Sequence, residues 1–154
     1  MSELKRTVLY QAHLEAGATM VDFGGWDMPI QYPAGIVAEH LYCRRHCGIF
    51  DVSHMGRIDV EGKDMVAFLQ HILSSNVLAL DLNQAQYCII PDANGYAIDD
   101  AYLYRFEEGK YFLVINAGNI DKDWAHLTAE AKNFDVKLTN VSDKYAAIAV
   151  QGPE

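Results

Sequence analysis

The chain has 154 residues, 51% of them hydrophobic, which is enough for one domain or two small ones with a substantial core. Its 21 acidic residues against 12 basic ones give a formal charge of −9, which argues against nucleic acid as a partner because that binding needs clustered Lys and Arg. No apolar run approaches the roughly 20 residues of a membrane span, and neither a signal peptide nor a disulfide framework is evident. We therefore expect a cytoplasmic protein that binds no membrane.

The first part of the chain is rich in Gly and Pro over residues 17–35, which predicts an ordered but irregular segment with buried aromatic residues. A helix is expected from Ile36 to Cys47, ended by Gly48, with His40, Cys43 and Cys47 on one stripe. These three side chains are a candidate metal site. The sequence lacks a CxxC pair or a second group of ligands to complete it, so we expect no metal.

Alternating and helical patterns then predict eight further elements. They are a strand at Arg57–Val60, a helix at Lys63–Leu73, strands at Gln86–Pro91, Tyr96–Phe106 and Lys110–Asn116, a helix at Ile120–Ala131, and strands at Asp135–Val141 and Tyr145–Gln151. This order predicts an α+β fold in which helices cover one face of an antiparallel sheet. The strand-helix-strands-helix-strand portion is close to a ferredoxin-like arrangement.

Two hairpin signals allow the strand register to be predicted. Asn94-Gly95 as a two-residue turn places Tyr87 opposite Tyr102 and Ile89 opposite Asp100. A three-residue loop at residues 107–109 places Val114 opposite Tyr102 and Asn116 opposite Asp100.

One face of this predicted sheet then carries Tyr87, Asp100, Tyr102, Tyr104 and Asn116, because side chains alternate with period two. Aromatic rings beside a carboxylate and an amide can hold a flat heterocycle. An ordinary solvent-facing sheet surface is the alternative, since Tyr and Asp are common there. Asp99 falls on the opposite face.

Two other sites are less promising from the pattern. Asp51, Ser53 and His54 are close in sequence, but neighbouring residues on an extended segment point to alternate sides, so local turn hydrogen bonds are expected rather than a catalytic triad. Lys122 and Asp123, near a helix start, are expected to face solvent.

Five ordered motifs resemble one known family, that of the glycine cleavage T-protein, an aminomethyltransferase. They cover residues 20–29 (MVDFGGWDMP), 48–56 (GIFDVSHMG), the span from Asn94-Gly95 to Asp99-Asp100, residues 114–117 with Lys122-Asp123, and residues 149–153 (AVQGP). The resemblance implies transfer of a one-carbon unit from the aminomethyl-lipoyl arm of the H-protein to tetrahydrofolate, giving 5,10-methylenetetrahydrofolate and ammonia.

The same resemblance implies roles for individual residues. Asp100 matches the catalytic aspartate beside the folate nitrogen that receives carbon. The matching pterin-pocket positions are Met55, Tyr87, Tyr102, Tyr104 and Asn116. Ala101 and Tyr102 replace the usual aliphatic residues, and Cys88 replaces Ser or Thr, so Tyr102 could reshape the pocket.

The resemblance also implies a division of the chain. Residues 1–53 begin a split folate-binding domain, residues 54–137 form the ferredoxin-like subdomain, and residues 138–154 begin the returning segment of the first domain. Family enzymes continue well beyond this length, so we expect an inactive N-terminal fragment, possible homodimer formation through unpaired strands, and a lipoylated H-protein partner for the whole enzyme. The alternatives are a non-catalytic folate-binding module and a related folate-dependent demethylase.

Overall fold

The computed structural model describes residues 3–154, which form two compact units. One unit comprises the chain up to His54 together with Lys144–Glu154, and the other is Met55–Asp143. No helix within the described residues has the length and apolar character that crossing a membrane requires.

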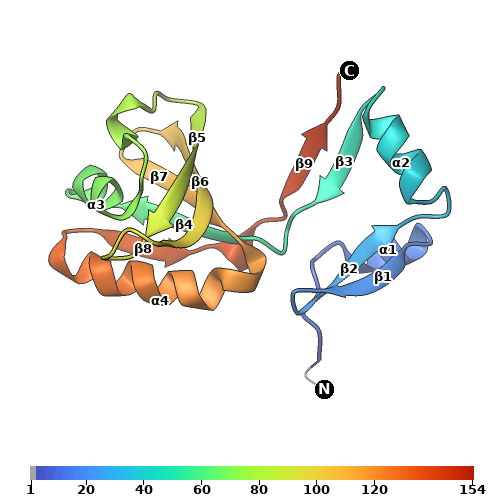
Figure 1. The fold of residues 1–154 in the computed structure, drawn as a ribbon, viewed down its shortest axis with the longest axis horizontal. Coiled ribbons are helices and arrows are strands. Elements are labelled where there is room, and N and C mark those ends of the chain that lie inside the picture. Colours follow the sequence, from blue (N-terminus) through green and yellow to red (C-terminus); the bar gives the residue numbers. More distant parts are fainter. Residues whose placement is uncertain (1–2) are drawn as a thin grey trace. The chain divides into compact units, whose positions relative to one another are not determined.

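The first unit is built from two small helices and two separate two-stranded sheets (Figure 1). Its elements are α1 (Tyr10–Glu15), β1 (Thr19–Phe23), β2 (Trp26–Gln31), α2 (Ile36–Cys43), β3 (Gly48–Asp51) and β9 (Ile148–Gln151). Strand β1 pairs with β2, and β3 pairs with β9 from the far end of the chain.

The second unit is a five-stranded antiparallel sheet in the order β5-β6-β7-β4-β8. Its elements are β4 (Gly56–Glu61), α3 (Met65–Ile72), β5 (Gln84–Pro91), β6 (Ala97–Glu107), β7 (Lys110–Ile115), α4 (Ile120–Glu130) and β8 (Lys137–Asn140). Four of the strands with α3 and α4 have the predicted ferredoxin-like order, and β5 is added at the edge beside β6. The predicted α+β class, with helices on one face of an antiparallel sheet, is confirmed.

Helices α3 and α4 cover one face of this sheet because each carries an apolar stripe. Phe68, Leu69 and Ile72 of α3 and Leu127 of α4 are at most 2% exposed, and they pack on buried strand residues such as Leu113. Burial of each such side chain contributes about 1.5–3 kcal/mol, so this layer supplies the main stabilisation of the unit. The opposite face of the sheet is left without a helix of this unit.

The predicted register holds in the middle of the sheet. Tyr87 pairs with Tyr102, Ile89 with Asp100, and Val114 with Tyr102. Both turns differ from the prediction, because the first loop spans residues 92–96 and the second is the two-residue Glu108-Gly109. A register shift beside each turn compensates, so the side chains of the central residues still reach the predicted faces.

Several local predictions are wrong. Residues 19–31 form the β1–β2 hairpin, because Gly24 and Gly25 both have positive φ and supply the type I′ turn. Phe23 beside this turn is 59% exposed rather than buried. Helix α2 ends at Cys43 rather than Cys47, and strand β3 had not been predicted. Strand β8 pairs with β4, and the second unit extends to Asp143, beyond the boundary at residue 137 expected from the sequence.

Candidate functional site

An aromatic surface occupies the face of the sheet opposite α3 and α4, and we call Tyr87, Tyr102, Tyr104 and Phe112 the aromatic face. The rings of Tyr87 and Tyr102 meet edge to face at 5.5 Å between centroids, and Tyr102 lies 6.3 Å from Tyr104. Tyr87 is 51% and Tyr102 47% exposed, so a ligand can reach both rings. Alternation places the neighbouring Cys88, Ala101 and Leu103 in the core instead.

Asp100 lies at one end of this aromatic face and is held by Asn116, which follows the last residue of β7. The Asn116 side-chain nitrogen donates to Asp100 Oδ1 at 2.7 Å and lies 3.2 Å from the Asp100 carbonyl oxygen. Tyr87 reaches the same carboxyl group, and this hydrogen bond raises the pKa of the Tyr87 hydroxyl above its ordinary value. The face therefore presents a carboxylate of fixed orientation next to a phenol.

Asp99 points away from the aromatic face, toward α4. The Asn116 side-chain nitrogen also donates to Asp99 Oδ1 at 3.0 Å, so one amide joins the two neighbouring aspartates. Burial alone would raise the pKa of Asp99, but hydrogen bonds from Asp123 and Asn116 outweigh it and hold the pKa below the usual range.

Asp123 is fully buried, which contradicts the expectation that it faces solvent. It lies on α4 one turn before Leu127, within the apolar stripe that packs against the sheet. Burial is the largest of the causes that raise the pKa of Asp123 to about 7. The hydrogen bond with Asp99 and the negative charge of Asp99 act in the same direction. The helical period could have revealed this position, because residue 123 falls between Ile120 and Leu127 on the buried side.

The remaining sequence-derived site positions are less distinctive. Met55 is half-buried immediately before β4. Cys88 is buried behind the aromatic face, where its thiol donates to the Ala101 carbonyl at 3.3 Å, and burial raises its pKa to about 11. The Cys88 thiol therefore belongs to the core and does not reach the surface of the aromatic face.

Asp51 and Ser53 form local turn contacts, as predicted, rather than a catalytic triad. Asp51 Oδ1 accepts the Ser53 backbone N–H at 2.9 Å, while the Ser53 hydroxyl bonds the backbone of Ala147. The unpredicted partner is His13, whose Nε2 lies 2.9 Å from Asp51 Oδ2. Thr7 donates to the same oxygen at 2.7 Å, so a buried polar cluster fixes the start of the chain to β3.

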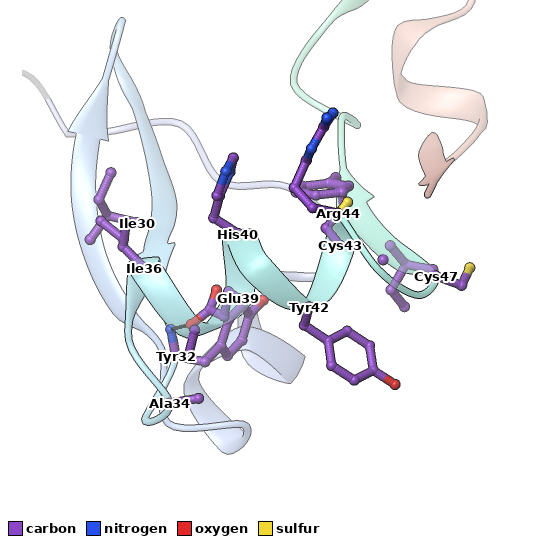
Figure 2. Close-up of a pocket in the computed structure, with 14 residues that line it drawn as sticks. Ile30, Tyr32, Ala34, Ile36, Glu39, His40, Tyr42, Cys43, Arg44 and Cys47 are labelled. Atoms are coloured by element: carbon purple, nitrogen blue, oxygen red, sulfur yellow. Dashed lines mark hydrogen bonds between the residues drawn. The ribbon is translucent and has the colours of Figure 1, made fainter. Parts of the chain in front are cut away.

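An apolar hollow of about 650 Å³ lies in the first unit, between β2, α2 and β3 (Figure 2). It is lined mainly by aliphatic and aromatic side chains, among them Ile30, Tyr32, Ile36, Tyr42 and Phe50. His40, Cys43 and Cys47 also belong to the lining, but Figure 2 shows their side chains pointing in different directions. No group of three metal-binding side chains converges anywhere in residues 3–154.

Comparison with known proteins decides the family. A family model described as the GCVT N-terminal domain matches residues 9–154. The chain belongs to this family. The GCVT N-terminal domain thus accounts for both compact units.

Curated relatives of this GCVT N-terminal domain carry the name aminomethyltransferase. The chain is 53% identical to one from Deinococcus deserti and 50% identical to one from Thermus thermophilus, with 98% of this chain covered in both cases. The solved glycine cleavage system aminomethyltransferase T from Bartonella henselae is similar with a TM-score of 0.92 at 38% identity, over 98% of this chain and 41% of that one. The chain spans about 42% of the length of the curated relatives it matches.

Proposed function

We propose that this GCVT N-terminal domain supplies the pterin-binding face and the catalytic carboxylate of a tetrahydrofolate-dependent aminomethyltransferase. The observation that carries the proposal is the position of Asp100 beside Tyr87 and Tyr102, with its carboxylate held by Asn116. Membership of the family and the name shared by its relatives support the same activity.

The aromatic face fits a flat heterocycle that carries N–H donors. Tyr87, Tyr102 and Tyr104 offer exposed or partly exposed ring surface, and Asp100 adjoins it with a hydrogen-bond acceptor. We propose Met55 and Asn116 as further members of the pterin pocket. Tyr102 is bulkier than the aliphatic residue usual in the family and narrows this face.

Asp100 has two tasks in the proposed reaction. Tetrahydrofolate supplies the nitrogen that accepts the one-carbon unit. The Asp100 carboxylate, oriented by the Asn116 amide, can accept the proton released there and stabilise positive charge that develops in the transition state. Fixed orientation raises the rate because the group need not be arranged during each turnover.

We further propose that the first unit belongs to a folate-binding domain that is completed by the part of the longer relatives outside the match. Exposed apolar side chains on β3 and β9 support this, since Ile49 is 72% and Val150 63% exposed. The whole enzyme would act in the cytoplasm and accept the aminomethyl group from a lipoylated H-protein. Residues 1–154 alone should then bind tetrahydrofolate more weakly than micromolar and turn over little.

A chimera tests the proposal. Residues 1–154 would replace the matching N-terminal segment of the Thermus thermophilus relative, and ammonia release from aminomethyl-lipoyl H-protein would be measured with and without tetrahydrofolate. We expect folate-dependent activity, and a loss of about a hundredfold or more on Asp100→Asn. Asp121→Asn, which removes an exposed carboxylate of α4, is the matched control and should retain activity.

Four results would oppose the proposal. A folded chimera without folate-dependent ammonia release would remove the aminomethyltransferase assignment, and folate binding without turnover would favour the non-catalytic module. A chimera that releases formaldehyde from an N-methyl substrate instead would indicate the related demethylase. Micromolar tetrahydrofolate binding by residues 1–154 alone, measured by calorimetry, would contradict the proposed division of the folate site.

A further inference from the structure

Asp99 and Asp123 form a pair of carboxyl groups beneath the aromatic face. Asp123 is 0% exposed, and neither of its carboxyl oxygens accepts a hydrogen bond from a donor in residues 3–154. Oδ2 of Asp99 is also buried and receives none from an amide, hydroxyl or cationic donor in residues 3–154, while its Oδ1 accepts from Asn116. The two carboxyl groups nevertheless face each other, because a hydrogen bond between them is among the causes that shift the pKa of both.

Two adjacent buried carboxylates cannot both remain charged at low cost, because each would lose solvation and repel the other. A proton retained between them removes the repulsion and turns two acceptors into a donor and an acceptor. The donor is Asp123, because Asp99 already receives a hydrogen bond from Asn116 that favours its charged form.

The pair is connected to the open face through a single amide. The Asn116 side-chain nitrogen carries two hydrogens and lies 3.0 Å from Asp99 Oδ1 and 2.7 Å from Asp100 Oδ1. A fixed Asp99 therefore fixes the Asn116 amide, and the amide fixes the carboxylate of Asp100.

We propose that Asp99 and Asp123 share one proton and, through Asn116, act as positioning residues for the Asp100 carboxylate at the aromatic face. The proton-sharing itself is independent of the ligand, whereas the benefit to catalysis rests on the function proposed above. Loss of the shared proton would leave two neighbouring anions, loosen Asn116 and release Asp100 from its fixed orientation.

The charges around the pair come from two elements. Asp99 and Asp100 of β6 favour the protonated form of Asp123, while Lys122 of α4 opposes it. The Lys122 ammonium donates to the Ile98 carbonyl at 2.8 Å, so it is held at the sheet end. Burial, the largest cause, and the two aspartates outweigh Lys122 and raise the pKa of Asp123 to about 7.

Nuclear magnetic resonance of the 154-residue chain between pH 5.5 and 8.5 tests the proposal. We expect one aspartate side-chain carboxyl resonance to titrate with a midpoint near 7 and to disappear in Asp123→Asn. The Asn116 side-chain amide should shift with the same midpoint, and its hydrogen exchange should accelerate about tenfold above it, after correction for base catalysis.

The variants separate positioning from simple packing. The amide that Asp123→Asn introduces can still donate to Asp99, so the Asn116 amide should remain protected across the whole pH range. Asp123→Leu removes the donor and should leave the Asn116 amide poorly protected at every pH. Asp121→Asn should behave as the unchanged chain.

The unchanged chain alone can overturn the proposal, whether or not a variant folds. The absence of an aspartate carboxyl titrating in this range, or an Asn116 amide indifferent to that titration, would refute it. Neither measurement contains folate, so failure of the folate-dependent chimera together with a positive titration would reject only the proposed function.

Discussion

The buried position of Asp123 predicts an unusual dependence of stability on pH. The pKa of Asp123 is about 7 in the folded chain against 3.8 for an ordinary aspartate carboxyl, a difference of about 3. Each pKa unit corresponds to about 1.4 kcal/mol, so the upper limit of the effect is about 4 kcal/mol. Because the folded chain keeps a proton that the unfolded chain has lost, stability falls as pH rises from about 4 to about 7 and then levels off.

Asp99 acts with the opposite sign in a different range. Its pKa is lowered in the folded chain, so its contribution is present above pH 3.8 and is lost as pH falls below that value. The two windows do not overlap, so of these two groups only Asp123 changes the stability above pH 4.5.

Tryptophan fluorescence can restrict the measurement to the second unit. The chain has two tryptophans, of which Trp124 packs against the core of the second unit and Trp26 lies in the first. In a Trp26→Phe background, urea unfolding followed at Trp124 should show stability falling by up to about 4 kcal/mol between pH 4.5 and 7.5. Adding Asp123→Asn should abolish this fall, and adding Asp121→Asn should not. Parallel pH profiles for the background and its Asp123→Asn variant would refute the reasoning.

Three further predictions concern other parts of the chain. His13→Ala should destabilise the first unit by about 1–3 kcal/mol, because it removes a hydrogen-bond partner of the Asp51 side chain, which is 1% exposed. Urea unfolding followed at Trp26 measures this, and an unchanged midpoint would contradict it. Gly62→Ala should destabilise the second unit by more than about 1 kcal/mol, measured by thermal unfolding, since Gly62 has φ 124° and an added Cβ would meet the Asp135 carbonyl at 2.5 Å. The chain should dimerise at high concentration through unpaired strand edges of the first unit, and Val150→Lys on β9 should weaken the dimer. Sedimentation measures both, and a monomer at every concentration would contradict this prediction.

Much of the central sheet could be predicted from the sequence, for a physical reason. The register of β5, β6 and β7 is determined by alternation, because every second residue, such as Cys88, Leu103 and Leu113, must face α3 and α4. A wrong turn assignment at Asn94-Gly95 therefore did not displace Asp100, since a register shift absorbed the difference. The position of Asn116 beside Asp100 followed from the same constraint.

The parts that were not predicted depend on long-range contacts or on signals that were given too little weight. Strand β3 is a short segment whose partner among residues 3–154 is β9, about a hundred residues later, which local pattern does not reveal. The Gly24-Gly25 turn was a recognisable hairpin signal that we interpreted as irregular structure. Asp123 is buried although charged residues are usually exposed. That rule fails here because a second carboxyl group can share the proton of Asp123.

The pairing of β3 with β9 has a consequence for the order in which the chain folds. The intervening unit begins and ends side by side, since the Val141 amide donates to the Arg57 carbonyl at 2.9 Å. Once that unit has formed, the flexible segment that separates β3 from β9 shrinks from about a hundred residues to about ten, which lowers the entropic cost of closure by about 2 kcal/mol. During synthesis, β3 must wait until the entire second unit and β9 have left the ribosome, so the first-made part of this chain is the last to be completed.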